Sequence, residues 1–257
     1  MIRIESASKT FAKGTPNEVY ALKNVSLTIE KGDFVTVIGT NGSGKSTLLN
    51  AIAGTLTLDA GRVKINNEDV TKLPDFKRAK YIGRVFQNPF SGTAPTMTVA
   101  ENLQLAYLRG EKKSLTIAMT SAQKKLLRER VAELRMGLEN RMDIPIGLLS
   151  GGQRQALTLL MAALKKPEIL LLDEHTAALD PISAELVLAI TQEIISKYHL
   201  TALMVTHSMS YATRFGNRVI MMNLGEVACD IQGEEKRTLT EQTLLKRFEE
   251  RHIHVVI

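Results

Sequence analysis

One segment constrains the fold of this chain more than any other feature, and its sequence is Gly39-Thr40-Asn41-Gly42-Ser43-Gly44-Lys45-Ser46. It matches the pattern G-x-x-x-x-G-K-[ST] at every fixed position. A dense apolar run precedes it at 34–38, and apolar residues at helical spacing follow it at 48–53. A buried strand, a glycine-rich loop and a helix in this order predict a phosphate-binding loop, because backbone N–H groups and the positive end of the helix converge there.

The same motif assigns chemical roles to its last residues. We expect Lys45 to reach the β- and γ-phosphates of a bound nucleotide, the Ser46 hydroxyl to ligate Mg²⁺, and Thr47 to belong to the same nucleotide-binding segment. The loop therefore predicts binding of a nucleoside triphosphate with Mg²⁺. It does not by itself distinguish kinases, GTPases and motor ATPases.

Two further apolar runs end in polar residues that suit the same site. Residues 169–172 are followed by Asp173 and Glu174, and residues 203–206 are followed by His207. Ligands of open α/β sheets bind at the carboxyl ends of the strands, so we expect these ends to converge with Gly39 on one crevice. There Asp173 would hold Mg²⁺ and Glu174 would act as general base on an attacking water, while His207 would contact the γ-phosphate and orient that water.

A second glycine-rich segment, Leu149-Ser150-Gly151-Gly152-Gln153, lies just upstream of the acidic run and is followed by Arg154-Gln155. With this signature segment and the phosphate loop in the same order, the chain resembles the ATP-binding-cassette (ABC) ATPases over about residues 2–230. The resemblance implies that the nucleotide is ATP and that the chain hydrolyses it. It also implies that the signature segment binds the γ-phosphate of ATP held by a second chain, which makes two composite sites.

The resemblance extends to two loops near these motifs. Gln87 corresponds to the family's glutamine that senses Mg²⁺ and the attacking water, which would make it both a catalytic residue and a metal ligand. Ala178, Leu179 and Asp180 correspond to a loop that crosses the interface between two cassettes.

The adenine contact and one departure from the family pattern complete the expected site. Phe11 corresponds to the aromatic residue that stacks on adenine, with Tyr20 as the alternative if residues 13–18 shift the register. His175 stands where the family usually has proline after the catalytic glutamate. Asp173 and Glu174 are present, so we expect the site to be active.

Strands alternate with helices around the phosphate loop, which indicates an α/β core with parallel strands. The resemblance implies a P-loop NTPase cassette with a RecA-like parallel sheet, a small antiparallel β subdomain and an inserted α-helical subdomain. We expect one domain over 1–257, divided into a catalytic core with the β subdomain at 1–89 and 166–232, a helical signature subdomain at about 90–165, and a short tail at 233–257.

Several local patterns predict individual elements. Short strands are expected at 2–4 and 25–29, and a hairpin around Leu224-Gly225-Glu226. Apolar residues at Leu127, Val131, Leu134 and Leu138 have helical spacing. Asp180 followed by proline is the start signal of a helix.

Charge and hydropathy limit the partners. The formal net charge is +6 and only 5% of residues are aromatic, so we expect solvated basic faces or apposition to an anionic membrane surface, and no nucleic-acid partner. No stretch reaches 18 apolar residues, the N-terminus has no signal-peptide pattern, and Cys229 has no partner cysteine, all of which fit the cytosolic side.

Two functions from different classes agree with the resemblance. In the first, the chain is the ATPase of an ABC transporter, forms a homodimer, and works through an integral membrane permease with an extracytoplasmic substrate-binding protein. It would then lie on the cytoplasmic face of the membrane as a peripheral subunit. Residues 173–181 resemble a branch associated with branched-chain amino acid permeases, which implies import of an amino acid or similar small solute. The alternative is a soluble ABC ATPase that drives cofactor assembly or another non-transport process.

Overall fold

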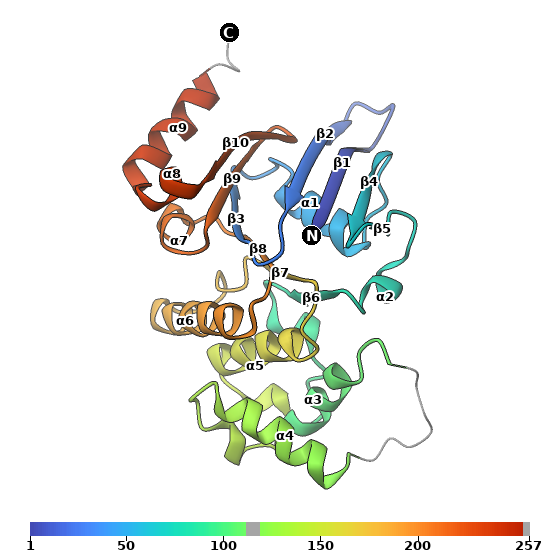
Figure 1. Cartoon of the computed structure of the whole chain (residues 1–257), viewed down its shortest axis with the longest axis vertical. Coiled ribbons are helices and arrows are strands. Elements are labelled where there is room, and N and C mark those ends of the chain that lie inside the picture. Colours follow the sequence, from blue (N-terminus) through green and yellow to red (C-terminus); the bar gives the residue numbers. More distant parts are fainter. Residues whose placement is uncertain (112–118, 254–257) are drawn as a thin grey trace.

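The computed structural model describes residues 1–111 and 119–253, and its centre is a six-stranded sheet (Figure 1). In spatial order the strands are β10 (Glu226–Gln232), β9 (Arg218–Asn223), β3 (Phe34–Gly39), β8 (Ala202–Val205), β7 (Ile169–Asp173) and β6 (Ile82–Val85). Neighbouring strands from β9 to β6 are parallel, and β10 is antiparallel to β9. The predicted parallel α/β core and the hairpin at Leu224 are confirmed.

Strand β7 shows why the core strands are continuous apolar runs. Its residues Ile169, Leu170, Leu171 and Leu172 are all fully buried. Side chains alternate across a strand, so the first and third join the apolar core on one face of the sheet, and the second and fourth join the core on the other. A strand covered on both faces needs apolar side chains at every position.

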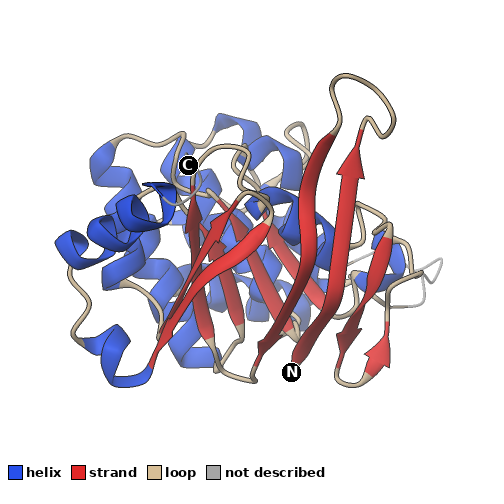
Figure 2. Ribbon diagram, turned by 90° about the horizontal axis from the view of Figure 1, so that it is seen from above, coloured by secondary structure: helices blue, strands red, loops and turns tan. Residues whose placement is uncertain are grey.

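A second sheet is antiparallel and lies beside the first (Figure 2). Its strands are β2 (Val19–Ile29), β1 (Ile2–Phe11), β4 (Ala60–Ile65) and β5 (Glu68–Asp69). Strands β1 and β2 are longer than the short strands expected at 2–4 and 25–29, because their pairing continues to Phe11 opposite Val19. Register shifts between Ile4 and Thr10 interrupt the apolar alternation, so the sequence signal ends before the backbone pairing does.

The helices and 3-10 turns (η) cover both sheets. They are α1 (Lys45–Ala53), α2 (Asp75–Arg78), η1 (Pro89–Gly92), α3 (Val99–Tyr107), α4 (Ser121–Ala132), η2 (Leu138–Asn140), η3 (Ile146–Leu148), α5 (Gly151–Ala163), α6 (Pro181–Tyr198), α7 (Met209–Arg214), α8 (Gly233–Arg237) and α9 (Glu241–Ile253). Helix α1 shares one apolar core with the antiparallel sheet and one face of the parallel sheet. Helices α3, α4, α5 and α6 share another core with the opposite face.

The helical block differs in one detail from its sequence pattern. Helix α4 ends at Ala132, so Leu134 and Leu138 lie beyond it, although both are buried with Leu127 and Val131. Arg135 at φ 54° and Gly137 at φ 71° turn the backbone out of the helix. The turn and η2 keep Leu134 and Leu138 directed into the core, so the apolar spacing continues beyond the end of the helix.

The predicted division into subdomains stays a prediction. Phe34, Val85 and Leu170 of the parallel sheet belong to the same apolar core as Leu103 of α3 and Leu127 of α4, so the helical block does not have a core of its own. Residues 112–118 of that block and 254–257 of the expected tail lie outside the described residues. In the described part of the chain, no helix combines the length and apolarity needed to cross a membrane.

Arg78 holds the far end of the helix that follows the phosphate loop. Its side chain is buried and donates to four backbone carbonyls, of Leu73, Ala51, Ile52 and Thr71, at 2.7–2.9 Å. Two of these carbonyls belong to the last turn of α1, where a cation also suits the negative end of the helix dipole.

Replacing Arg78 by methionine should lower the free energy of unfolding by about 2–4 kcal/mol, because buried carbonyl oxygens lose their donors. Urea unfolding in the absence of nucleotide measures the loss. Lys77→Met is the matched control, since Lys77 is adjacent and exposed. An equal, small loss in both variants would contradict this role of Arg78.

Candidate functional site

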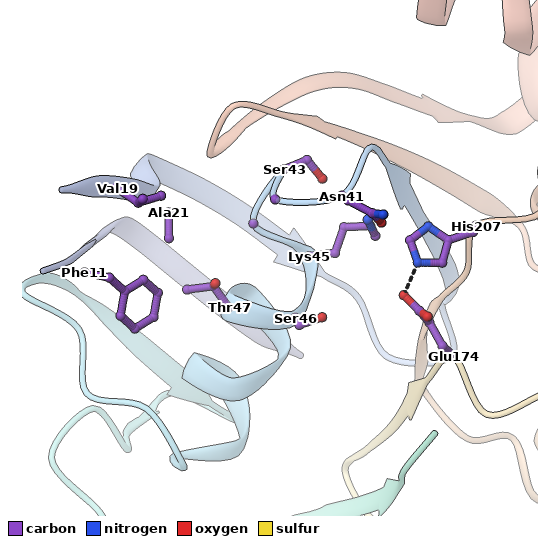
Figure 3. Close-up of a pocket in the computed structure, with 12 residues that line it drawn as sticks. Phe11, Val19, Ala21, Asn41, Ser43, Lys45, Ser46, Thr47, Glu174 and His207 are labelled. Carbon is purple, nitrogen blue, oxygen red and sulfur yellow. Dashed lines mark ion pairs between the residues drawn. The ribbon is translucent and has the colours of Figure 1, made fainter. Parts of the chain in front are cut away.

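A pocket of about 280 Å³ lies where the phosphate loop meets the ends of β7 and β8 (Figure 3). Its lining residues are Phe11, Val19 and Ala21 from β1 and β2, Asn41, Gly42, Ser43, Gly44, Lys45, Ser46 and Thr47 from the loop and α1, and Glu174 and His207, which follow β7 and β8. The structure thus brings the phosphate loop together with Glu174 and His207. The roles assigned to these residues stay predictions.

Two glycines allow the loop to curl tightly. A Cβ on Gly39 would lie 2.3 Å from the carbonyl oxygen of Met222 and 2.5 Å from Oγ of Ser43. Gly44 has φ 101°, and a Cβ there would lie 2.4 Å from the carbonyl oxygen of Ala21. Any side chain would clash at both positions, so glycine is required. Within the described chain, the buried Oγ of Ser43 has no hydrogen-bond partner.

The ammonium group of Lys45 lies within the same loop. Its Nζ donates to the carbonyl oxygens of Gly39 and Thr40, each at 2.9 Å. Burial lowers the pKa of the Lys45 amine, and the nearby Glu174 carboxylate partly opposes that shift. An ammonium has three hydrogens, so one remains for a ligand. With the N-terminus of α1 and the unpaired Ser43 hydroxyl, this concave loop suits phosphate oxygens.

Glu174 and His207 face each other at one wall of the pocket (Figure 3), with 2.5 Å between Oε1 and Nε2. They meet because β7 and β8 are neighbours and the Glu174 N–H donates to the Val205 carbonyl at 3.1 Å. Glu174 has φ 44°, a left-handed conformation that is strained for this residue type and is concentrated at functional sites. A carboxylate held against an imidazole is equipped to accept a proton from water and to orient that water.

Asp173, at the end of β7, is paired with an arginine that the sequence analysis missed. Arg84 Nη2 lies 3.0 Å from Oδ2 of Asp173 and 2.7 Å from Oδ1 of Asn50 in α1. Its guanidinium also lies 4.7 Å from the centre of the Phe86 ring. The contact joins residues 89 positions apart, so no local pattern signals it. Arg84 therefore ties the strand that leads to Gln87 to both α1 and the candidate metal ligand.

Of the two aromatic candidates for the adenine contact, the structure places Phe11 at the pocket. Phe11 lines it with 41% of its surface exposed, and Lys9 Nζ lies 5.8 Å from the ring centre. Tyr20 is not one of the described residues that line the pocket. Its hydroxyl is hydrogen-bonded to Glu18. An exposed ring at the rim can stack on a planar base.

The signature segment begins α5 with a capping box. The Ser150 side chain accepts from the Gln153 N–H, and the Gln153 side chain accepts from the Ser150 N–H. In the described chain, none of residues 149–153 lines the pocket of the phosphate loop. The structure therefore leaves the signature segment outside the pocket that its own chain forms.

The signature segment instead lies beside the loop at 178–180. A Cβ on Gly151 would lie 3.2 Å from Cδ2 of Leu179. Asp180 caps α6 by accepting from the Ser183 N–H at 3.0 Å, so the predicted helix start at Asp180 is confirmed. Ser150, Gly151 and Ala178 are exposed on this side of the molecule.

Gln87 is exposed just after β6 and does not belong to the pocket lining among the described residues. The backbone next to Gln87 is held by α5, because Gln155 Nε2 in that helix donates to the Phe86 carbonyl at 3.2 Å. The structure does not bring Gln87 together with Glu174 in one cavity.

His175 is the other residue whose contacts the sequence analysis missed. It is buried, and its Nε2 lies 3.1 Å from Oγ1 of Thr191 in α6. Burial lowers the pKa of His175 to about 4, so the imidazole is uncharged at neutral pH. The departure from proline was visible in the sequence, but its partner in α6 was not.

The residues present fit a nucleotide that carries its own divalent ion. In the described chain, no group of three or more His, Cys, Asp or Glu side chains could hold a metal by itself. Mg²⁺ is usually held by one or two protein oxygens together with substrate phosphates. The Ser46 hydroxyl at the start of α1 and the Asp173 carboxylate at the end of β7 are oxygens of this kind.

Comparisons with known proteins match the chain to one family. Residues 22–177 match the family model described as ABC transporter. The tyrosine transport ATP-binding protein of Clostridioides difficile is 42% identical over 97% of this chain and 99% of its own length. The arginine transport ATP-binding protein ArtM of Bacillus subtilis is 36% identical over 90% of each. Among solved structures, the ATP-binding cassette MJ0796, a dimer bound to ADP and Pi, has a TM-score of 0.76 at 32% identity, covering 90% of this chain and 98% of that one.

Proposed function

The chain belongs to the ABC transporter family as an ATP-hydrolysing, nucleotide-binding subunit, and from this we propose that two copies close around two MgATP to drive solute transport through a separate membrane permease. The observation that carries the proposal is that the residues predicted to contact phosphate lie in two separate parts of the molecule, one inside the pocket and one outside it. The phosphate loop, Glu174 and His207 share one pocket, and the signature segment lies outside it. A site divided in this way is complete only when a second copy presents its signature segment.

The proposed reaction follows from the geometry of the pocket. Lys45 and the loop N–H groups bind the phosphates, and Phe11 stacks on the adenine. Glu174 accepts a proton from the water that attacks the γ-phosphate, and His207, 2.5 Å from Glu174, holds both in line. Ser150 and Gly152 of the second copy stabilise the charge that develops on the γ-phosphate.

The metal would lie beside these groups, with Ser46 and Asp173 as its ligands on the protein, and Gln87 would join them only in a conformation that brings it to the pocket. When bound, Mg²⁺ neutralises charge on the β- and γ-phosphate oxygens. Arg84 orients the Asp173 carboxylate through the contact at 3.0 Å. Because Arg84 also contacts α1, it fixes the distance between Asp173 and the helix that carries Ser46.

Ser150→Arg should leave ATP affinity near that of the wild type but weaken the ATP-dependent dimer by about 100-fold, close to 2.7 kcal/mol. The long side chain blocks the approach of the signature segment to phosphate held by the other copy. Light scattering after size exclusion, with and without MgATP, measures the dimer. Thr120→Arg is the matched control, since Thr120 begins α4 with the same type of capping box. A full ATP-dependent dimer from Ser150→Arg would contradict the composite site.

The proposed solute is an amino acid or similar small molecule, and the proposed direction is import. Two relatives that match nearly their whole length are named for tyrosine and arginine transport. The partners we propose are a second identical cassette, an integral membrane permease and an extracytoplasmic substrate-binding protein. The subunit would then work on the cytoplasmic face of the membrane, attached through the permease.

Affinity purification of the tagged chain from its own cells in mild detergent tests this assignment. We expect a polytopic membrane protein to co-purify in roughly equal amount, and an untagged strain to yield none. Recovery of soluble partners alone, under conditions that preserve other membrane complexes, would contradict transport. It would favour an ABC ATPase with a role in cofactor assembly.

A further inference from the structure

His175 follows Glu174 directly but points away from the nucleotide pocket into the protein. It is 2% exposed and Thr191 is 1% exposed, so their contact is shielded from water. The chain passes from β7 through the loop at 174–180 into α6, and Thr191 lies well inside that helix. The contact therefore fastens the first part of the loop to the helix into which the loop leads.

The direction of this hydrogen bond follows from the bonds of Thr191. The Thr191 hydroxyl has one hydrogen and donates it to the Val187 carbonyl at 2.7 Å. Toward His175 it can only accept, so Nε2 of His175 carries the hydrogen and donates across 3.1 Å. Losing the Thr191 hydroxyl therefore leaves the buried N–H of His175 without this acceptor, whereas losing His175 leaves the Thr191 hydroxyl bonded to Val187 alone.

Glu174 needs such support because its backbone is strained. A non-glycine residue at φ 44° is less stable than in the usual conformations by about 1–3 kcal/mol and persists only when its surroundings hold it. On one side Glu174 is held by β7 and by its N–H bond to Val205. On the other side the next side chain is His175, bonded to Thr191.

We propose that His175 is a positioning residue, whose hydrogen bond to Thr191 holds Glu174 in its positive-φ conformation with the carboxylate against His207. The proposal rests on the proposed function, in which Glu174 is the general base. Histidine and threonine then form one unit, so substitutions of the two are coupled.

Single-turnover and steady-state hydrolysis by the full chain test the proposal. Thr191→Val removes the acceptor and keeps the side-chain shape, and His175→Leu removes the donor. Each should lower kcat by about tenfold, because small misplacement of a catalytic group is costly, with ATP affinity changed by less than about twofold. The double variant should be no slower than either single variant, since the second substitution removes nothing further.

Matched variants separate positioning from simple packing. Thr191→Ser keeps the hydroxyl, and His175→Gln keeps an N–H donor near the position of Nε2, so both should retain kcat within about threefold. Hydrogen exchange gives a readout that does not depend on turnover. Backbone amides at 174–177 should exchange faster in Thr191→Val than in Thr191→Ser, in the absence of nucleotide.

Three outcomes would overturn the proposal. The first is that Thr191→Val keeps both the kcat and the amide exchange rates of the wild type. The second is that the losses of kcat from the two single variants multiply in the double variant. The third is that the variants lose ATP affinity and stability with no larger loss of kcat. Glu174→Gln distinguishes failure of the inference from failure of the proposed function. If Glu174→Gln keeps hydrolysing ATP, the general base is wrongly assigned; if it stops turnover and the His175 variants behave as wild type, only the inference fails.

Discussion

Replacing Glu174 by glutamine should lower the rate of ATP hydrolysis by about 10²–10⁴-fold while ATP still binds. The amide has the shape of the carboxylate but does not accept a proton from the attacking water. Its contact with His207, at 2.5 Å in the native chain, can persist as a hydrogen bond, so the pocket keeps its form. The substitution also removes a negative charge close to Lys45 and to bound phosphates, so ATP affinity should stay equal or rise.

An accumulated ATP-bound dimer is the second expected result for this variant. Closure around ATP does not need hydrolysis, whereas reopening follows it, so the variant should stay dimeric in MgATP. Size exclusion measures the dimer and phosphate release measures the rate. Glu193→Gln is the control, because Glu193 is a half-exposed glutamate on α6 that pairs with Arg135. Near-normal hydrolysis by Glu174→Gln would remove this residue from the role of base.

Lys45→Ala should weaken MgATP binding by about 100-fold or more. A charge-assisted hydrogen bond contributes about 1.5–3 kcal/mol, and Lys45 also donates to the carbonyls of Gly39 and Thr40, which keeps the loop curled. The fold itself should survive. Burial lowers the pKa of this amine, so removing it also relieves a desolvation cost, which partly offsets the two lost hydrogen bonds.

Equilibrium titration and thermal unfolding separate these two effects. In the wild type, MgATP should raise Tm further as its concentration exceeds Kd, and in Lys45→Ala the rise at the same concentration should be far smaller, while Tm without nucleotide stays similar. Lys31→Ala is the control, since Lys31 is exposed and lies outside the pocket. Unchanged nucleotide affinity in Lys45→Ala would contradict the role of this residue.

The parts of the molecule that the sequence predicted are those with a local pattern. The strand, loop and helix around Lys45 follow from one motif, and the ends of β7 and β8 follow from apolar runs that stop at Asp173 and His207. Since the five strands from β9 to β6 are parallel, their carboxyl ends lie on one edge, and convergence of these residues needs no further information. The resemblance added the expected site roles.

The parts that the sequence did not predict depend on contacts between distant side chains. Arg84 and Asp173 are 89 positions apart, and Arg78 reaches the end of α1 from 26–27 positions away. Thr191, the partner of His175, lies 16 positions further along the chain in another element, so the periodicity of a single helix or strand does not reveal the contact. Apolar periodicity showed which residues around α4 are buried but did not show where the helix ends, because residues in the turn after the helix are buried in the same core.

The position of β3 in the sheet has a consequence for how the chain folds. The strand that carries the phosphate loop lies between β8 and β9, and both follow it in the chain only after residue 200. Contacts between such distant segments form late, because a long loop must close before they contribute. During synthesis the loop motif therefore emerges long before the strands that flank it, so ATP binding should mark chains that have completed the sheet. A chain that stops before β8 contains the whole phosphate-loop sequence but lacks the two strands that flank β3 and hold the loop in its binding conformation.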